Sequence, residues 1–257
     1  MEKTQNQQVL EETEIQVPSS KSLFLVSSAI HCNHGIYSAE DRLQQTIKTC
    51  QSIIDRVPKD VDVDICILDG GTQELTEKEK ELLKPYVDQF FEFYDNETIM
   101  KIQKINNWDI VKNMSEIVMY GHFYREMTNN IMSNYDRVFK MSGRYTLNEK
   151  FNYKSHLSCE EKIFIRGPYT SQFSSELTGG VRFQYMSRLW SFDSKLTPYI
   201  SDTYKNMFDH MNHRLSEGGY IDIEHLLAAH LRMDLIVLSS LIGIEGNIAP
   251  NGVGISD

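Results

Sequence analysis

An amphipathic helix between two short apolar segments is the feature of this sequence that most constrains the fold. Leu23–Ser28 is an apolar run that predicts a short buried strand. Ser38 and Asp41 form the pattern of a helix capping box, and apolar side chains then recur at helical spacing to about Pro58. A second strand is expected at Val61–Leu68. A strand, a helix and a second strand make a βαβ unit with a right-handed crossover, so we expect a wound α/β sheet.

The rest of the chain continues this alternation and then becomes less regular. A long helix is expected over Lys112–Ser133 and a buried strand over Val138–Met141. Further strands are expected at Val87–Tyr94, Lys162–Arg166, Val181–Met186 and, as the last strand, Leu235–Ser240; further helices are expected after the capping box Thr76–Glu79 and at Tyr199–Leu215 and Asp222–Arg232. Because residues 1–21 hold few apolar side chains, we expect a flexible polar tail there. Residues 22–145 and 146–257 are then two halves of one domain, the second less regular.

Composition limits the class of protein. The 257 residues with 40% hydrophobic content suffice for one large α/β domain. A net charge of −10 argues against a nucleic-acid binder, which usually carries a basic face. No apolar run approaches the roughly 20 residues that span a bilayer, and the acidic segment before Leu23 does not fit a signal peptide. The four cysteines form no Cys-x-x-Cys pair, which favours a reducing compartment, so we expect a cytoplasmic protein. The oligomeric state stays open.

Two histidine pairs were weighed as metal ligands. They are His31 with His34, beside Cys32, and His210 with His213. Neither is matched by a second ligand pair at suitable spacing, so a polar loop and a solvated helix face are the favoured interpretations. We therefore assign no metal ligands from the sequence.

The segment Arg137–Tyr145 carries the clearest sign of a binding site. Lys140, Ser142, Arg144 and Tyr145 cluster where the expected strand ends, around Gly143. Ligands of open α/β sheets bind at the carboxyl ends of the strands, and glycine allows close approach of the backbone. Two fixed positive charges suit an anion such as a phosphate or diphosphate. An ordinary strand-to-loop turn with surface cations explains this segment equally well.

The order of several short motifs resembles the GT-A fold glycosyltransferases, which transfer a sugar from a nucleotide-sugar donor. The motifs are Val26–Ala29 after the first strand, Arg42–Thr46 in the helix, Leu68–Gly71 after the second strand, Asn107–Asn113, and Lys140–Tyr145. The last of these is similar to a Lys-x-Ser-Gly-Arg-Tyr segment of less studied bacterial and viral members. The resemblance implies a GT-A-like, Rossmann-like mixed sheet flanked by helices, with an acceptor region toward the C-terminus.

The same resemblance implies the ligands and the donor site. The donor is a nucleotide-sugar, a UDP-sugar by family habit, and the acceptor is a hydroxyl of a glycan or another molecule. The implied donor-binding residues are Ser27, Ser28, Ala29, Arg42, Asp69, Gly70, Lys112, Asn113, Lys140, Ser142, Gly143, Arg144 and Tyr145.

This chain departs from the family at the metal-binding motif. GT-A enzymes usually carry Asp-x-Asp after this strand, where this sequence has Ser142-Gly143-Arg144. Asp62 and Asp64 have the right spacing but stand at the start of a strand, where solvent-facing acids are the favoured interpretation. We therefore expect no required cofactor, with Lys140 and Arg144 neutralising the leaving diphosphate in place of a metal. The use of a divalent metal stays open.

Acids near the C-terminal half supply a candidate catalytic base. Glycosyl transfer passes through an oxocarbenium-like transition state, and an inverting enzyme must also deprotonate the acceptor hydroxyl. Glu224 is the first choice for this base and Asp222 the second, since both stand at an expected helix start after a glycine pair. The alternative is that both acids simply cap that helix. The loop-like segments 174–180 and 245–252 are candidates for lids over the donor.

Two other classes remain as alternatives. A sugar-nucleotide nucleotidyltransferase also uses a wound α/β sheet, but its first strand should lead into a glycine-rich basic loop, which is not found after Leu23–Ser28. The absence of Gly-x-Gly-x-x-Gly there likewise disfavours a Rossmann dehydrogenase or methyltransferase. A nucleotide- or carbohydrate-binding protein without turnover is the non-enzymatic alternative.

Overall fold

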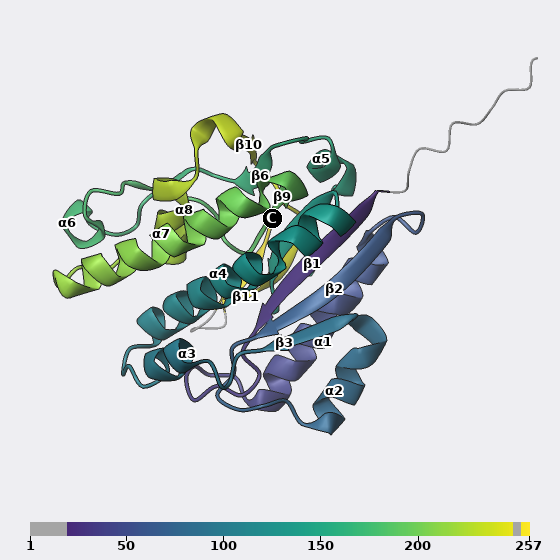
Figure 1. Ribbon diagram of the computed structural model, residues 1–257, viewed down its shortest axis with the longest axis horizontal. Helices are drawn as coiled ribbons and strands as arrows, with labels where there is room; N and C mark the ends of the chain where they lie inside the picture. Colours follow the sequence, from purple (N-terminus) through teal and green to yellow (C-terminus); the bar gives the residue numbers. More distant parts are fainter. Residues whose placement is uncertain (1–19, 249–252) are drawn as a thin grey trace, which may run out of the picture.

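A seven-stranded mixed sheet forms the centre of the protein in this computed structural model, which describes residues 20–248 and 253–257 (Figure 1). Its strand order is β10-β6-β9-β4-β1-β2-β3. The strands are β1 (Lys21–Ser28), β2 (Asp62–Asp69), β3 (Gln89–Glu92), β4 (Arg137–Ser142), β6 (Ile163–Arg166), β9 (Leu189–Asp193) and β10 (Ile236–Ser239). Strands β1 to β4 are parallel, and β9 runs antiparallel to both β4 and β6. The expected wound α/β sheet is therefore present.

Helices cover both faces of this sheet. Figure 1 shows α1 and α2 on one face and α4 with α7 on the other. The helices are α1 (Ala39–Arg56), α2 (Glu77–Leu83), α3 (Glu97–Ile102), α4 (Trp108–Asn134), α5 (Tyr153–Leu157), α6 (Ser175–Thr178), α7 (Thr197–Ser216) and α8 (Ile223–His230). Successive side chains of a strand point to opposite faces. Leu23 and Leu25 accordingly pack in the core of α4, α7 and α8, whereas Phe24 and Val26 pack in the core of α1.

Capping residues set the helix starts, largely as the sequence predicts. The capping box of Ser38 and Asp41 opens α1, and an equivalent pair opens α2. The start of α4 differs from the expectation, because the Asn107 side chain accepts from the Asp109 and Ile110 N–H groups. The helix therefore begins at Trp108, four residues before the predicted Lys112.

The second half of the chain completes the same sheet, with several departures from the expected elements. Strand β9 was not predicted, although it pairs with β4 at the sheet centre. The strand expected at 181–186 is reduced to β8 (Phe183–Gln184), which pairs with β7 (Tyr169–Thr170). Strand β10 is not the last one, because β11 (Ile244–Ile248) and β12 (Val253–Ser256) follow and form a small sheet with β5 (Tyr145–Leu147).

The structure also differs from the predicted lids and the predicted tail. Residues 175–178 form α6 rather than a loop, and 244–248 form a strand. The rest of the second lid, 249–252, and residues 1–19 of the expected tail lie outside the described residues. Lys21, placed in the tail, belongs to β1 and pairs with Asp62 of β2. Among the residues that the structure describes, no helix combines the length and the apolar character needed to cross a bilayer.

Candidate functional site

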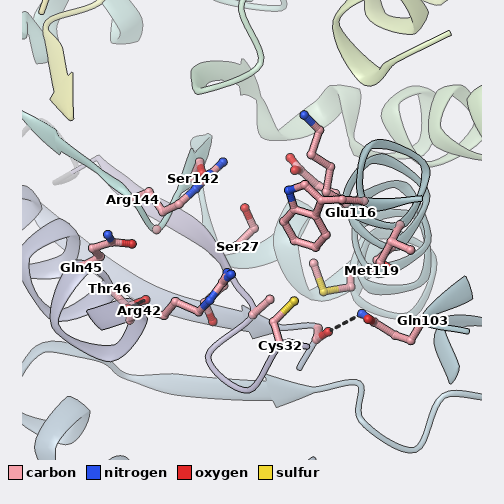
Figure 2. Close-up of a pocket in the computed structure, with 18 residues that line it drawn as sticks. Ser27, Cys32, Arg42, Gln45, Thr46, Gln103, Glu116, Met119, Ser142 and Arg144 are labelled. Atoms are coloured by element: carbon pink, nitrogen blue, oxygen red, sulfur yellow. Dashed lines mark hydrogen bonds between the residues drawn. The ribbon is translucent and has the colours of Figure 1, made fainter. Parts of the chain in front are cut away.

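A pocket that is partly open to solvent lies where β1, β2 and β4 end. The helices α1 and α4 form its sides. Figure 2 shows Arg42 and Arg144 on one side and Glu116 and Met119 of α4 on the other. Nine of the residues predicted to bind the donor line this pocket: Ser27, Ser28, Ala29, Arg42, Gly70, Lys112, Ser142, Gly143 and Arg144. Segments far apart in the sequence thus meet at one edge of the sheet, the edge at which ligands of open α/β sheets bind.

Two arginines make one wall of the pocket cationic. The buried Arg42 guanidinium donates to the backbone oxygens of His34 at 2.6 Å and Tyr37 at 3.2 Å. Burial lowers the pKa of Arg42, and the charge of Arg144 acts in the same direction. Within residues 20–248 and 253–257, neither arginine forms an ion pair with a carboxylate. Two like charges without an acidic partner leave this wall electrostatically suited to an anion.

Arg188, which was not predicted from the sequence, is a further cation near Arg144, although it does not line the pocket. Its guanidinium lies 5.5 Å from the ring centre of the buried Tyr145, and that of Arg144 lies 5.9 Å from the same ring. The backbone oxygen of Arg188 also accepts from the Ser142 N–H at 2.9 Å. Tyr145 therefore contacts two cations and does not itself line the pocket. Arg188 precedes the unpredicted strand β9, so only knowledge of the sheet order would have placed it here.

Glycine is required at position 143 by the packing of the backbone, not by the ligand contact that was predicted. Its N–H donates to the Ser27 backbone oxygen at 2.8 Å and is not free to bind a ligand. A Cβ at this position would lie 2.8 Å from that same oxygen. Glycine is therefore needed for the close approach of the β4 end to the β1 end, which corrects the expectation of a ligand-binding N–H.

Asp69 supports the loops behind the pocket rather than lining it. Its carboxylate accepts from the Ser28 hydroxyl at 2.5 Å and from the N–H groups of Ile30 and Gly71 at 3.0 and 2.9 Å. Burial raises the pKa of Asp69, and these three hydrogen bonds oppose the rise. With its oxygens committed to these partners, Asp69 is a positioning residue, contrary to the donor contact implied for it.

Lys140 is also located behind the pocket, with its charge already paired. The side chain is 1% exposed and forms an ion pair with Glu116, and its ammonium donates to the Ser187 backbone oxygen at 2.6 Å. Glu116, not Lys140, lines the pocket. Lys140 thus lies outside the pocket lining with its charge paired, whereas the sequence predicts that it contacts a diphosphate.

Lys112 and Asn113 lie on different sides of α4. Lys112 lines the pocket and pairs with Asp109 at 3.0 Å. The Asn113 amide donates to the Tyr220 hydroxyl at 2.9 Å, and its oxygen accepts from the Ile223 N–H at 3.2 Å. Asn113 thus attaches the start of α8 to α4 and does not contact the pocket, which corrects its predicted role.

The two candidate acids have separate roles at the start of α8. Asp222 caps the helix by accepting from the His225 N–H at 3.0 Å, as the capping alternative predicts. Its Oδ1 also lies 2.6 Å from His225 Nδ1, and His225 Nε2 lies 2.7 Å from Ser171 Oγ. Asp222, His225 and Ser171 thus have the order of a hydrolase triad. The ring of His225 is completely buried, however, and the Ser171 hydroxyl donates to the Phe173 backbone oxygen at 2.9 Å. We interpret it as a structural link.

Glu224 is the acid that remains available for proton transfer. Its carboxylate accepts from the Ser187 hydroxyl at 3.2 Å and N–H at 3.4 Å. Burial raises the pKa of Glu224, the charge of Asp222 raises it further, and Arg188 opposes both. Because Ser187 also accepts from Lys140, one chain of polar contacts connects Glu116 in the pocket with Glu224. Glu224 does not line the pocket, but a carboxyl group with a raised pKa that is linked to a pocket residue is a candidate general base.

Apart from Glu116 Oε1, which pairs with Lys140, four buried polar atoms around the pocket have no hydrogen-bond partner within the described parts of the chain. They are Gln45 Oε1, Gln103 Oε1, Trp108 Nε1 and Ser115 Oγ. Buried polar groups are normally paired, and leaving one unpaired costs roughly 1–3 kcal/mol. Four such atoms around one pocket point to a polar ligand. None of these four side chains was predicted to bind a ligand, although Trp108 and Ser115 lie seven residues apart, at helical spacing, on one face of α4.

The histidines that were weighed as metal ligands have other partners. His31 lies 3.0 Å from Glu79, and the ring of His34 packs on Trp108. His210 contacts His230 at 3.0 Å rather than His213. Across residues 20–248 and 253–257, no group of three or more His, Cys, Asp and Glu side chains is arranged to hold a metal ion. Asp62 and Asp64 pair with Lys21 at the start of β2, away from the pocket.

In comparisons with known proteins, no protein-family model and no curated sequence matches this chain.

Proposed function

We propose that this protein is a glycosyltransferase that transfers a sugar from a nucleoside-diphosphate sugar to an acceptor hydroxyl. The observation that carries this proposal is the pocket at the ends of β1, β2 and β4, where Arg42 and Arg144 form no ion pair with an acid among the residues that the structure describes. A diphosphate supplies the missing negative charge. A UDP-sugar donor and a GT-A type of fold are proposed from the resemblance of the motifs, and the structure has a mixed sheet flanked by helices.

Arginine side chains would stabilise the leaving group. Departure of a nucleoside diphosphate places negative charge on its terminal phosphate, and preorganised cations near that position lower the barrier. Arg144 and Arg42 line the pocket directly, and Arg188 lies beside Arg144 across the Tyr145 ring. This revises the pair expected from the sequence, because Arg188 takes the place of Lys140.

Glu224 would accept the proton of the acceptor hydroxyl in an inverting transfer. The acceptor oxygen attacks the anomeric carbon while its proton passes to Glu224 and the bond to the diphosphate breaks. A raised pKa makes a carboxylate a stronger base, and burial raises the pKa of Glu224 in this way. Asp222 is the weaker choice, because its oxygen is committed to the helix cap and His225.

Release of UDP from a panel of UDP-hexoses, with EDTA present, tests the proposal. We expect release by the wild-type protein and a loss of roughly 10- to 100-fold in Arg144→Ala, the size of one charge-assisted hydrogen bond. Glu224→Gln should lose turnover while it retains UDP binding. Arg125→Ala is the matched control, since this α4 arginine is largely exposed and lies outside the pocket. Equal turnover in wild type and Arg144→Ala would refute the assignment, and binding without turnover in the wild type would indicate the non-catalytic alternative.

A further inference from the structure

Ser115 and Glu116 of α4 form a polar corner of the pocket that the functions assigned above do not use. Ser115 is 6% exposed, lines the pocket, and its hydroxyl has no partner among the described residues. Glu116 follows it along the helix, also lines the pocket, and its side chain is 23% exposed. A buried unpaired hydroxyl beside a carboxylate gives one donor and several acceptors at a single point.

The contacts of Glu116 fix which end of the pocket this corner occupies. Glu116 pairs with Lys140, Lys140 donates to the Ser187 oxygen, and Ser187 donates to Glu224. These contacts connect the corner to the candidate base. Figure 2 shows Gln103 and Cys32 at the other end, where the Gln103 amide donates to the Gly70 oxygen at 3.3 Å. The anomeric carbon must be near the base, so the transferred sugar must occupy the end of Ser115 and Glu116.

We infer that Ser115 and Glu116 recognise the hydroxyl groups of the transferred sugar, an inference that rests on the proposed function. The carboxylate of Glu116 can accept from two neighbouring sugar hydroxyls, and the Ser115 hydroxyl can bond a third group. Lys140 holds the carboxylate in place from behind through its ion pair and its bond to Ser187. A pyranose with two adjacent free hydroxyls fits this arrangement, and a sugar that lacks them would leave Lys140 as the donor to Glu116 and the remaining lone pairs unused.

The ratio of two affinities tests this inference directly. Isothermal titration calorimetry of UDP and of each UDP-hexose in the panel gives, for every variant, the Kd of UDP divided by the Kd of the UDP-hexose. A ratio above one means that the sugar adds to the affinity. Ser115→Ala should weaken UDP-sugar binding roughly 3- to 10-fold, the value of one neutral hydrogen bond, and leave UDP binding unchanged. Glu116→Gln should also lower the ratio of the UDP Kd to the UDP-hexose Kd. The free energy of unfolding of this variant, measured in urea, shows whether its fold is retained. Arg125→Ala, which lies outside the pocket, is the control and should leave both affinities unchanged.

The possible failures are distinguishable. If wild type binds neither UDP nor any UDP-hexose, the proposed function fails and this inference falls with it. If wild type prefers a UDP-sugar over UDP but Ser115→Ala keeps the same ratio, only the sugar subsite is overturned. A ratio that changes in Gln103→Ala and not in Ser115→Ala would place the sugar at the other end and also overturn it.

Discussion

Replacing Lys140 by Met should destabilise the protein strongly, because this change breaks an ion pair without removing its acidic partner. Lys140 is almost fully buried, pairs with Glu116, donates to the Ser187 oxygen and lies 5.6 Å from the ring centre of Tyr120. Methionine keeps the length of the side chain and most of its packing. It removes the charge, so Glu116 loses its counter-ion and the Ser187 oxygen loses a donor.

The expected cost follows from the exposure of the two partners. Removing one member of a fully buried pair costs about 3–5 kcal/mol. Glu116 keeps 23% of its side chain exposed, so water compensates part of the loss. We therefore expect Lys140→Met to lower the free energy of unfolding by about 2–4 kcal/mol.

A double-mutant cycle separates the ion pair from the packing. Glu116→Gln removes the charge that Lys140→Met would leave unpaired, so the double variant should be more stable than the sum of the single changes predicts, by about 1–2 kcal/mol. Urea unfolding followed by tryptophan fluorescence measures all four proteins, since Trp190 is fully buried. Additive effects, or a single variant as stable as wild type, would refute the view that Lys140 is a paired, structural cation.

Three further predictions concern the turn, a buried histidine and the cysteines. Gly143→Ala should lower the free energy of unfolding by about 1–3 kcal/mol, because the new Cβ would lie 2.8 Å from the Ser27 oxygen, and unchanged urea denaturation would contradict this. Burial and Arg137 hold the pKa of His156 well below its ordinary value of 6.5, so the unfolded chain binds the proton first and stability should fall as pH drops below about 6.5, by up to roughly 1.4 kcal/mol per pH unit. Urea titrations at pH 5 and pH 7.5 should show a smaller difference in His156→Gln, and an equal difference would contradict the assignment. In the native protein a maleimide should label Cys32, which lines the pocket, and UDP should protect it. Cys50 should stay unlabelled, because burial raises the pKa of its thiol to about 12. In mass spectrometry, labelled Cys50 would contradict its burial, and Cys32 that UDP does not protect would count against the pocket as the nucleotide site.

The parallel half of the fold was predictable because its signals are local. Strand β1, helix α1 and strand β2 each carry their own apolar pattern or capping box, and the structure places them close to the expected residues. Strand β9 was missed because its five residues, Leu189–Asp193, are stabilised by β4, whose residues are distant in the sequence. Strand β11 was missed because its five residues include Gly246 and Asn247, which are typical of loops. Gly246 has a φ of 153° in this strand.

The candidate site shows the same division between local and distant information. Parallel strands end at a common edge, so the convergence of Ser27, Gly70 and Arg144 could be predicted from strand ends alone. The true partners of Lys140 could not, because Glu116 and Ser187 come from other elements. A motif identifies which residue types are present, but the tertiary neighbours decide which charges are free.

Titration of UDP into the wild-type protein and Arg144→Ala, in the presence of EDTA, tests the central claim most directly. Arg144 lines the pocket without an acidic partner among residues 20–248 and 253–257, so it should bind the diphosphate itself. Wild type should bind UDP with EDTA present, and Arg144→Ala should bind it roughly 10- to 100-fold more weakly. The largely exposed Arg125→Ala should match wild type. No binding of UDP by the wild type, or equal affinity in wild type and Arg144→Ala, would contradict this claim.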